Sequence, residues 1–315
     1  MTQASPSFAA LEQRLDALSA ESDKSIVSVW LADLSGHARY AYHADVAHYA
    51  ASTMKLPLVL AFQGGVVSGR LDPEQAVPVH NAFRSVADGS VFSLDLADDQ
   101  DPDTWAAIGS PRTAAQLAEH AITHSGNLAT NLLLDLVGRE AVAAVLAAVG
   151  CSPTTIVARG IEDAVARERG ISNLVTAADL GLLMAAVGRR EPALGGAAVC
   201  GPVEAILRRQ LHVDQIPAGL PPGLPTASKS GWVPGVSHDA ALVWPADRPP
   251  FVLVICTTID RSESDAAALV ASIASQVWAA DSEAREAVEA REVTEDPDDT
   301  DDPVEAAAGH QPPAR

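Results

Sequence analysis

The most informative segment of the chain reads STMKLPLVLAF and spans residues 52–62. Its last seven residues are apolar and helix-like, whereas Ser52 and Lys55 stand three positions apart, so a helix places the hydroxyl and the amine on one face. Unpaired backbone N–H groups at a helix N-terminus also stabilise a developing alkoxide. We therefore predict that Ser52 is a nucleophile and that Lys55 is its base or proton relay.

Lysine is rare in this chain, which adds weight to Lys55. The sequence holds three lysines, Lys24, Lys55 and Lys229, among 21 basic residues, so arginine is its usual cation. A buried lysine can lose its proton, whereas arginine in practice cannot. One S-x-x-K spacing remains weak evidence by itself, because an N-capping serine beside a snorkelling lysine has the same pattern. The case for chemistry depends on the motifs that accompany it.

A second polar motif, Ser125-Gly126-Asn127, lies where one predicted helix ends and another begins. Ser125 is placed to pass a proton to a leaving group, and the Asn127 amide is placed to donate to Lys55 or to a substrate carbonyl. Taken alone, the motif is more typical of a helix-junction cap.

A third motif, Lys229-Ser230-Gly231, opens a predicted edge strand. Gly231 would let a substrate backbone approach closely, because it has no side chain. Lys229 would provide a fixed positive charge for an anionic group of the substrate. We expect Ser230 to belong to the same substrate-binding edge.

The three motifs, in this order, resemble those of the class A β-lactamases and their penicillin-binding relatives, which read S-x-x-K, S-D-N and K-T-G. The resemblance extends over about residues 8–280. It implies an acyl-enzyme mechanism in which Ser52 attacks an amide or lactam carbonyl, with the oxyanion held by the backbone N–H groups of Ser52 and Trp232. Trp232 is bulky for the mouth of such a site and is expected to narrow the range of substrates.

The family also uses a glutamate, on a loop after the second motif, to activate the water that clears the acyl-enzyme. Glu162 lies in the matching region and is our candidate, although Ala166 replaces the asparagine expected four residues later. Glu168, followed by Asn173, is a weaker alternative. A structural interpretation of Glu162 is also open, in which it only holds the loop through an ion pair with Arg159 or Arg167.

Two further departures from the family pattern matter. Gly126 replaces the acid of the second motif, which removes a buried carboxylate and its hydrogen bonds. The acidic segment 88–103 is predicted to be a surface loop, and it would repel anions if it overhung the cleft.

A serine–histidine pair would imply different chemistry. His124 directly precedes Ser125, and His238 follows the third motif, so either ring could serve Ser52 if Lys55 were structural. We rank this mechanism lower, because a histidine beside a turn is more often solvated or hydrogen-bonded. The sequence contains no pattern typical of metal, nucleotide or dinucleotide binding, so no cofactor is expected.

Periodicity predicts how the chain is organised. Apolar residues from Phe8 to Leu18 recur at helical spacing, a β-rich hairpin follows up to Tyr42, and the middle of the chain is mostly helical. Strand signals and a final helical run return towards the C-terminus, at 229–232, 240–244, 251–259 and 262–278. Strands at both ends that enclose a helical middle indicate a sheet lobe completed by the two termini, with a helical lobe inserted between them.

We therefore predict an α+β fold, a three-layer α/β/α sandwich, in one catalytic domain of residues 1–280. The antiparallel sheet lobe comprises about 8–50 and 215–280, and the helical lobe about 52–212. Residues 281–315 hold 12 acidic residues and 3 arginines, which predicts a disordered acidic tail.

Composition excludes several classes of function. A formal net charge of −20 disfavours nucleic acids and anionic membrane surfaces as partners, because both attract lysine and arginine. No uncharged apolar run approaches the roughly 18 residues that span a bilayer. Residues 1–6 lack an export signal, so the expected location is the cytoplasm, although the resemblance suggests an exported protein. Three cysteines in apolar surroundings are predicted to be buried free thiols, Cys151, Cys200 and Cys256.

Together these observations predict a monomeric serine hydrolase that acts on a small molecule, a β-lactam in the first place, through an acyl-enzyme on Ser52. Two alternatives stay open. A D-alanyl peptidase or a small-ester or amide hydrolase would share the nucleophile without needing Glu162. A catalytically inert acyl-binding or scaffold protein would keep the fold around an inactive site.

Overall fold

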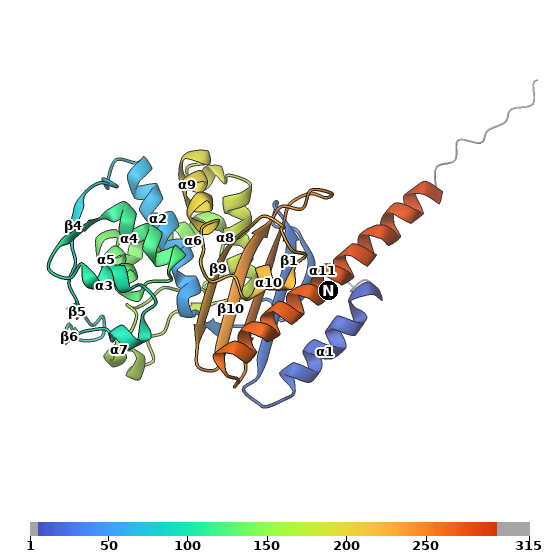
Figure 1. The fold of residues 1–315 in the computed structure, drawn as a ribbon, viewed down its shortest axis with the longest axis horizontal. Helices are drawn as coiled ribbons and strands as arrows, with labels where there is room; N and C mark the ends of the chain where they lie inside the picture. The colour runs from blue at the N-terminus through green and yellow to red at the C-terminus, as the bar shows by residue number, and fades with distance from the viewer. Residues whose placement is uncertain (1–5, 295–315) are drawn as a thin grey trace, which may run out of the picture.

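The computed structural model describes residues 6–294, and a five-stranded antiparallel sheet runs through the middle of one lobe (Figure 1). Its strand order is β2-β1-β11-β10-β9. The strands are β1 (Ile26–Asp33), β2 (Ala38–Tyr42), β9 (Thr226–Val233), β10 (Val236–Val243) and β11 (Phe251–Thr258). β1 pairs with β11 along its whole length, so segments from the two ends of the chain share one sheet, as the sequence predicts.

Both faces of the sheet are buried, because alternate residues of each strand point to opposite sides. In β11, Leu253 and Ile255 pack into one hydrophobic core, whereas Val252 and Val254 pack into the other. In β1, Leu31 belongs to the first core and its neighbour Trp30 to the second. The strands therefore read as nearly continuous apolar runs.

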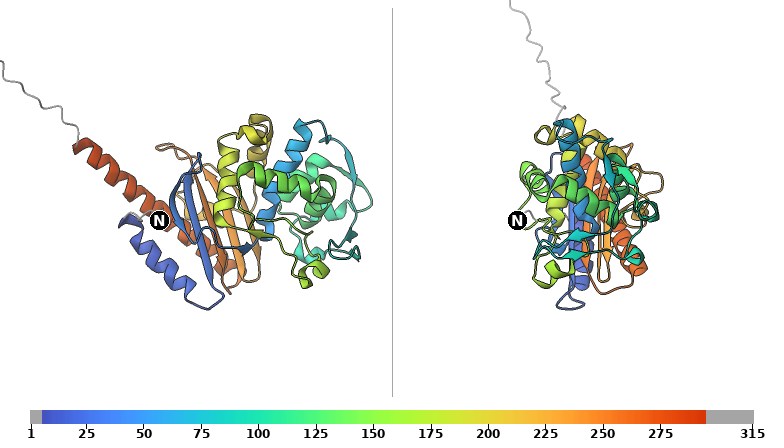
Figure 2. Two further views of the ribbon diagram at one scale, coloured as in Figure 1. Left: turned by 180° about the vertical axis from the view of Figure 1, so that it is seen from behind. Right: turned by 90° about the vertical axis from the view of Figure 1, so that its left-hand side faces the viewer.

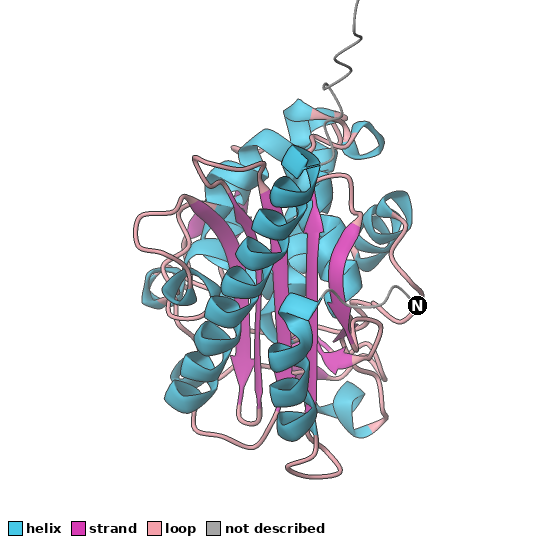
Figure 3. Ribbon diagram, turned by 90° about the vertical axis from the view of Figure 1, so that its right-hand side faces the viewer, coloured by secondary structure: helices cyan, strands magenta, loops and turns pink. Residues whose placement is uncertain are grey.

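Helices cover each face and complete the predicted three-layer α/β/α sandwich. On one side lie α1 (Ala9–Ser19) and α11 (Glu263–Thr294), which Figure 3 shows in front of the strands. On the other side, α8 (Ala177–Gly188) packs against β1, β10 and β11. Helix α1 is held by an apolar stripe at helical spacing, Leu11, Leu15 and Leu18.

The helical lobe lies on one side of the sheet lobe in the left view of Figure 2, and it surrounds a central helix, α2 (Lys55–Val67). Every residue from Lys55 to Phe62 is buried, as expected for a helix that other helices enclose. The other helices of the described chain are α3 (Pro102–Ala106), α4 (Ala114–Thr123), α5 (Asn127–Val137), α6 (Arg139–Val149), α7 (Ala164–Glu168), α9 (Ala197–Leu207) and α10 (Ile216–Gly219).

Short strands lie within and next to the predicted helical middle. They are β3 (His48–Tyr49), β4 (Ala76–Pro78), β5 (Phe83–Arg84), β6 (Val91–Phe92), β7 (Pro111–Thr113) and β8 (Leu174–Val175). They form two-stranded pairs, β3 with β8, β4 with β7 and β5 with β6. Because each strand is only two or three residues long, it carries no period that sequence patterning could detect.

The C-terminal boundary of the folded unit is a correction to the sequence prediction. Helix α11 continues to Thr294, so the predicted disordered tail is wrong over residues 281–294. Asp281 is buried and forms ion pairs with Arg39 at 2.9 Å and with Arg285 at 3.2 Å. The acidic composition of this stretch does not reveal that Asp281 anchors the helix, because Arg39, one of the cations that pair with Asp281, comes from the opposite end of the chain. The remainder of the predicted tail, 295–315, lies outside the described residues.

The cysteines are free thiols, as the sequence predicts. Cys200 and Cys256 are buried and Cys151 is partly buried, where burial raises its pKa to about 12 and keeps the thiol unreactive. Within residues 6–294, no helix has the length and apolar character needed to cross a bilayer.

A glycine in α8 tests the packing of the helical layer on the sheet. A Cβ on Gly181 would lie 2.0 Å from Cε3 of Trp30, so Gly181→Ala should destabilise the protein by about 1–3 kcal/mol in chemical denaturation. Gly64→Ala is the matched control, because nothing lies within 4 Å of its added methyl group in α2. This control should stabilise the protein by about 0.5–1 kcal/mol. Equal effects of the two substitutions would contradict the contact between α8 and β1.

Candidate active site

A cleft of about 720 Å³ opens where β9 meets the helical lobe. The predicted site residues that line it are Ser52, Ser125, Asn127, Glu162 and Trp232. Lys55, Lys229 and Ser230 are fully buried in the walls behind them. Three motifs that lie far apart in the sequence therefore meet at one cavity.

Ser52 lies in a 3₁₀ turn, η2 (Ala51–Met54), immediately before α2, rather than in the first turn of the α-helix itself. Ala51 before it has a φ of 44°, in the left-handed region that non-glycine residues rarely adopt. The turn is held from both sides, because Ala50 donates from its N–H to the carbonyl of Asn173 at 2.9 Å and Thr53 donates to the carbonyl of Ala50. The strained backbone presents Ser52 to the cleft.

Gly231 lies directly against this turn. A Cβ at position 231 would lie 2.7 Å from the backbone nitrogen of Ser52 and 2.8 Å from that of Thr53. The close approach that a glycine permits here is therefore made by the chain's own backbone, whereas the sequence predicts only the approach of a substrate. It brings edge strand β9 next to the Ser52 N–H.

Lys55 is completely buried and its ammonium group faces the second motif. Its Nζ donates to the Ser125 carbonyl at 2.6 Å, to Asn127 Oδ1 at 2.9 Å and to Ser125 Oγ at 3.3 Å. Burial and, second, the charge of Lys229 hold the pKa of Lys55 well below its usual range. The lowered pKa favours the deprotonated amine, which is the form of Lys55 that can act as a base.

Ser125 lies between the two buried lysines. Its Oγ is 3.1 Å from Lys229 Nζ as well as 3.3 Å from Lys55 Nζ, and its φ of 57° turns it out of the preceding helix, α4. Lys229 also donates to the carbonyl of Ser230 at 2.6 Å. Burial lowers the pKa of Lys229 to about 7, so it is not the fixed positive charge that the sequence analysis expects.

The side chains of Asn127 and Ser230 are less available to a substrate than expected. Asn127 Oδ1 accepts from Lys55, and its Nδ2 donates to the carbonyl of Asp98 at 2.9 Å. The Ser230 hydroxyl is buried and has no partner among the described residues. Trp232 does line the cleft, where its ring meets that of His212 at 4.8 Å between centroids.

The acidic segment 88–103 contributes more than a surface loop. Ala97, Asp98 and Gln100 border the cleft, whereas Asp101 is fully buried, so the prediction of a surface loop is wrong at Asp101. Asp99 accepts from the backbone N–H groups of Asn127 and Leu128, both at 2.8 Å. It thus caps the N-terminus of α5, where the helix dipole favours a carboxylate.

Glu162 reaches the cleft on the loop before α7, with a φ of 63°. Its Oε2 accepts from the Asp95 N–H at 2.8 Å, and its Oε1 is buried without a partner among the described residues. Burial raises the pKa of Glu162, and the carboxylates of Asp98 and Asp99 raise it further. Within the described chain Glu162 forms no ion pair, so the structural interpretation with Arg159 or Arg167 is wrong.

The Glu162 loop is instead held by amide and guanidinium groups. Asn131 accepts from the Ile161 N–H at 2.8 Å and donates to its carbonyl at 3.0 Å. Arg159 is buried and donates to the carbonyls of Gly160 and Ile171. Sequence reasoning did not single out Asn131, although its position one helical turn after Asn127 places both on one face of α5.

The weaker candidate, Glu168, is exposed at the end of α7 and does not line the cleft. Asn173, which accompanies it in the sequence, is buried, and its Oδ1 accepts from the N–H groups of Ala158 and Arg159. Asn173 therefore supports the loop and the Ser52 turn rather than a base at position 168.

Among the described residues, neither His238 nor His124 forms a hydrogen bond with the nucleophile, Ser52. His238 is buried, bonds the Tyr49 carbonyl through Nε2 at 2.9 Å and accepts from Thr257 N–H through Nδ1 at 3.2 Å. His124 bonds Thr123 Oγ1 through Nδ1 at 2.9 Å. Since neither ring lines the cleft, the geometry favours Lys55 over a serine–histidine pair.

An inserted helical lobe, a five-stranded terminal sheet and a cleft that joins Ser52, Lys55, Ser125 and Lys229 are the features of the class A β-lactamase fold. The sequence model of the β-lactamase enzyme family matches residues 10–280, and the chain belongs to that family.

Individual relatives agree with this membership. A β-lactamase of Streptomyces lavendulae is 33% identical over 164 residues, or 50% of this chain and 52% of the relative, so the chain spans about half the length of this curated relative. The structure of the last common ancestor of Gram-negative class A β-lactamases has a TM-score of 0.70 at 25% identity, covering 86% of this chain and 99% of that one. The structure of PBP-A has a TM-score of 0.70 at 22% identity, covering 87% and 97%, and shares the fold.

The buried lysines can be tested without a substrate. Protein labelled with ¹³C at lysine Cε has three lysine signals, because the chain has three lysines. We expect the Lys229 signal to titrate near pH 7 and the Lys55 signal to titrate well below the ordinary range for lysine, because burial penalises the charged form. Each signal is assigned by its loss in the Lys→Met variant at that position. Titration of both groups above about pH 10 would contradict the observed burial.

Proposed function

We propose that this protein is a serine hydrolase that opens β-lactams through an acyl-enzyme on Ser52. The observation that carries the proposal is the shared cleft, in which the Ser52 hydroxyl, the Ser125 hydroxyl between two buried lysines and the Glu162 carboxylate meet. This set contains a nucleophile, a base of lowered pKa, a proton donor and a second base, which are the groups that two-step acyl transfer needs.

Acylation begins at Ser52. Its Oγ bonds to the lactam carbonyl carbon while its proton passes to the neutral Nζ of Lys55, one helical turn away. The lactam C–N bond then breaks, and the nitrogen takes the proton of Ser125 Oγ. Lys55 and Lys229 both lie within hydrogen-bond distance of that oxygen and can restore its proton.

The oxyanion is assigned to the backbone N–H groups of Ser52 and Trp232. The Ser230 carbonyl accepts from Lys229 at the open edge of β9, and residues two apart in a strand point the same way, so the Trp232 N–H faces the same edge. Gly231 between them packs against the Ser52 nitrogen. Two donors that converge on one point, away from bulk water, stabilise developing negative charge strongly.

Deacylation is assigned to Glu162. As a carboxylate on the cleft wall, it takes a proton from water while the water oxygen bonds to the acyl carbon, and the Ser52 ester bond then breaks. Its raised pKa makes the carboxylate a better base than that of an ordinary glutamate. Asn131 and Arg159 hold the loop that carries it.

One observation favours the peptidase-like alternative. Position 166 is a fully buried alanine, so no side-chain amide stands one turn after Glu162 to hold a water, and Glu162 Oε2 is engaged by the Asp95 N–H. A penicillin adduct on such an enzyme would form but clear slowly.

Intact mass after exposure to a penicillin separates these functions. We expect one adduct per chain that clears within minutes, no adduct in Ser52→Ala, and a persistent adduct in Glu162→Gln, because that amide cannot accept the proton of water. A persistent adduct in the wild-type protein would indicate the peptidase-like function. No adduct with penicillins or with small active esters would indicate an inert scaffold.

The pH dependence of clearance tests Glu162 separately. Its raised pKa means that the carboxylate becomes protonated at a higher pH than an ordinary glutamate, so the lifetime of the adduct should lengthen as the pH falls, from a higher pH than an ordinary glutamate would give. Glu162→Gln should show a long lifetime with no such dependence on pH. A wild-type lifetime that does not change with pH would exclude Glu162 as the deacylating base.

A further inference from the structure

The space that a side chain at position 126 would fill is occupied by Asp101. A Cβ on Gly126 would lie 2.8 Å from both Cβ and Oδ2 of Asp101, which comes from the acidic segment before α3. Asp101 is fully buried. Gly126 stands where the related second motif has an acid, so the structure puts a carboxylate from another segment into that volume.

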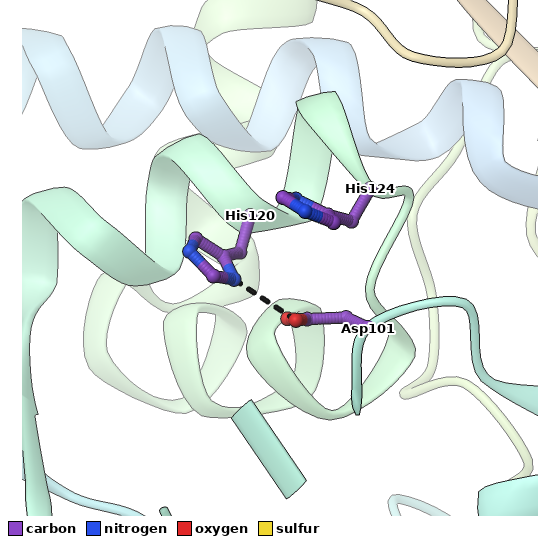
Figure 4. A group of neighbouring side chains, drawn as sticks. All are labelled: Asp101, His120 and His124. Carbon is purple, nitrogen blue, oxygen red and sulfur yellow. Dashed lines mark hydrogen bonds and ion pairs between the residues drawn. The ribbon is translucent and has the colours of Figure 1, made fainter. Parts of the chain in front are cut away.

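Asp101 is bound on several sides. Its Oδ1 accepts from the Thr104 N–H at 3.2 Å and bonds His120 Nδ1 at 2.9 Å, and its Oδ2 accepts from the Thr104 hydroxyl. Burying a carboxylate is costly unless such partners satisfy it. Figure 4 shows the His120 ring on α4 reaching down to Asp101, with the His124 ring stacked beside it.

The same residues are linked to the second motif, His120 by a direct hydrogen bond and Asp101 through Asp99. The carbonyl of His120 accepts from the Gly126 N–H at 3.1 Å, while the His120 ring bonds Asp101. Asp101 N–H donates to Asp99 Oδ1 at 3.2 Å, and that oxygen also accepts from the Asn127 N–H. Asp101 and His120 thus fix the backbone on both sides of Gly126, which carries Ser125 and Asn127 towards Lys55.

Asp101 also acts on Lys55 through its charge. The groups that face Lys55 are Lys229 from β9 and the carboxylates of Asp99 and Asp101, and these two acids counteract the lowering of the Lys55 pKa. Asp101 in turn raises the pKa of His120 through their hydrogen bond.

We propose that Asp101, held by His120, is a positioning residue that supplies from a distant segment the carboxylate missing at position 126, and that it aligns Ser125 and Asn127 with Lys55. Its catalytic consequence rests on the proposed function, whereas its effects on Lys55 and on packing at Gly126 do not.

The cluster is a hydrogen-bonded assembly rather than a metal centre. Asp101, His120 and His124 do have potential ligand atoms within 4.8 Å of one another. However, Asp101 Oδ1 and His120 Nδ1 are in direct contact at 2.9 Å, whereas two ligands of tetrahedral zinc, each about 2.0–2.2 Å from the ion, lie about 3.4 Å apart. His124 Nδ1 is bonded to Thr123.

The first test measures Lys55 without any substrate. In protein labelled with ¹³C at lysine Cε, Asp101→Asn should move the Lys55 titration to lower pH, because a neighbouring negative charge is lost. Asp103→Asn removes the same charge from an exposed position in α3 and should leave the titration unchanged. An unchanged Lys55 titration in Asp101→Asn would overturn the electrostatic part of the proposal.

The second test exchanges the carboxylate between the two segments. Gly126→Asp alone should lower the thermal unfolding midpoint by roughly 2–10 °C, because its side chain collides with Asp101. Asp101→Ala alone should slow acylation of Ser52 by a penicillin about tenfold or more. The double variant should recover both properties to within about threefold in rate and about 2 °C in midpoint of the wild-type protein.

The outcomes separate the two proposals. Strictly additive effects on the unfolding midpoint in the double variant would overturn the exchange of carboxylates, whether or not the protein is acylated. An unreactive wild-type protein whose unfolding midpoint recovers in the double variant would overturn the proposed function while keeping the role of Asp101 in shaping the motif. Addition of zinc chloride should leave the wild-type midpoint unchanged, and a rise of several degrees that His120→Gln abolishes would indicate a metal centre instead.

Discussion

The burial of Lys55 is the constraint on which the site depends. An ammonium group without water is very costly unless it is paired or deprotonated, and here its acceptors are the carbonyl and hydroxyl of Ser125 and the amide oxygen of Asn127. These acceptors stand at the start of α5, whereas Lys55 starts α2, so the two helices must meet at this point. The same burial lowers the pKa of Lys55, so packing and basicity have one cause.

Backbone strain accompanies this arrangement. Ala51, Ser125 and Glu162 all adopt positive φ without being glycine, and each lies at or next to a residue to which we assign a chemical role. Such conformations cost about 1–3 kcal/mol each and persist only where surrounding contacts hold them. Those contacts come from Asn173 behind Ser52 and from Asn131 behind the Glu162 loop. The backbone carbonyl of Asn173 and the side-chain amide of Asn131 therefore maintain the geometry around the cleft.

Much of the fold was predictable because it follows short-range patterns. The β-rich apolar runs of β1 and β11, the apolar stripe of α1 and the uninterrupted apolar run at the start of α2 are local patterns, and together they predict a sheet built from both ends of the chain. The extension of α11 past residue 280 was not predictable, because Asp281 is held by Arg39 from the far end of the sequence. The burial of Asp101 was not predictable for the same reason. An acidic, turn-prone segment indicates exposure to solvent, and the carboxylate of Asp101 is buried only because Gly126, which has no side chain, leaves room for it.

The sequence by itself determined the order of the motifs, the residue types available for acyl transfer and the overall division into a sheet lobe and a helical lobe, because these depend on spacing and composition. The tertiary structure decided which atoms of those residues are free. It turned the Asn127 donor towards Asp98, buried Lys229 so that its pKa is lowered to about 7, and placed Glu162 on the cleft wall without an ion pair to any described residue. Hydrogen-bond partners and desolvation are set by groups far apart in the chain, and no local pattern encodes them.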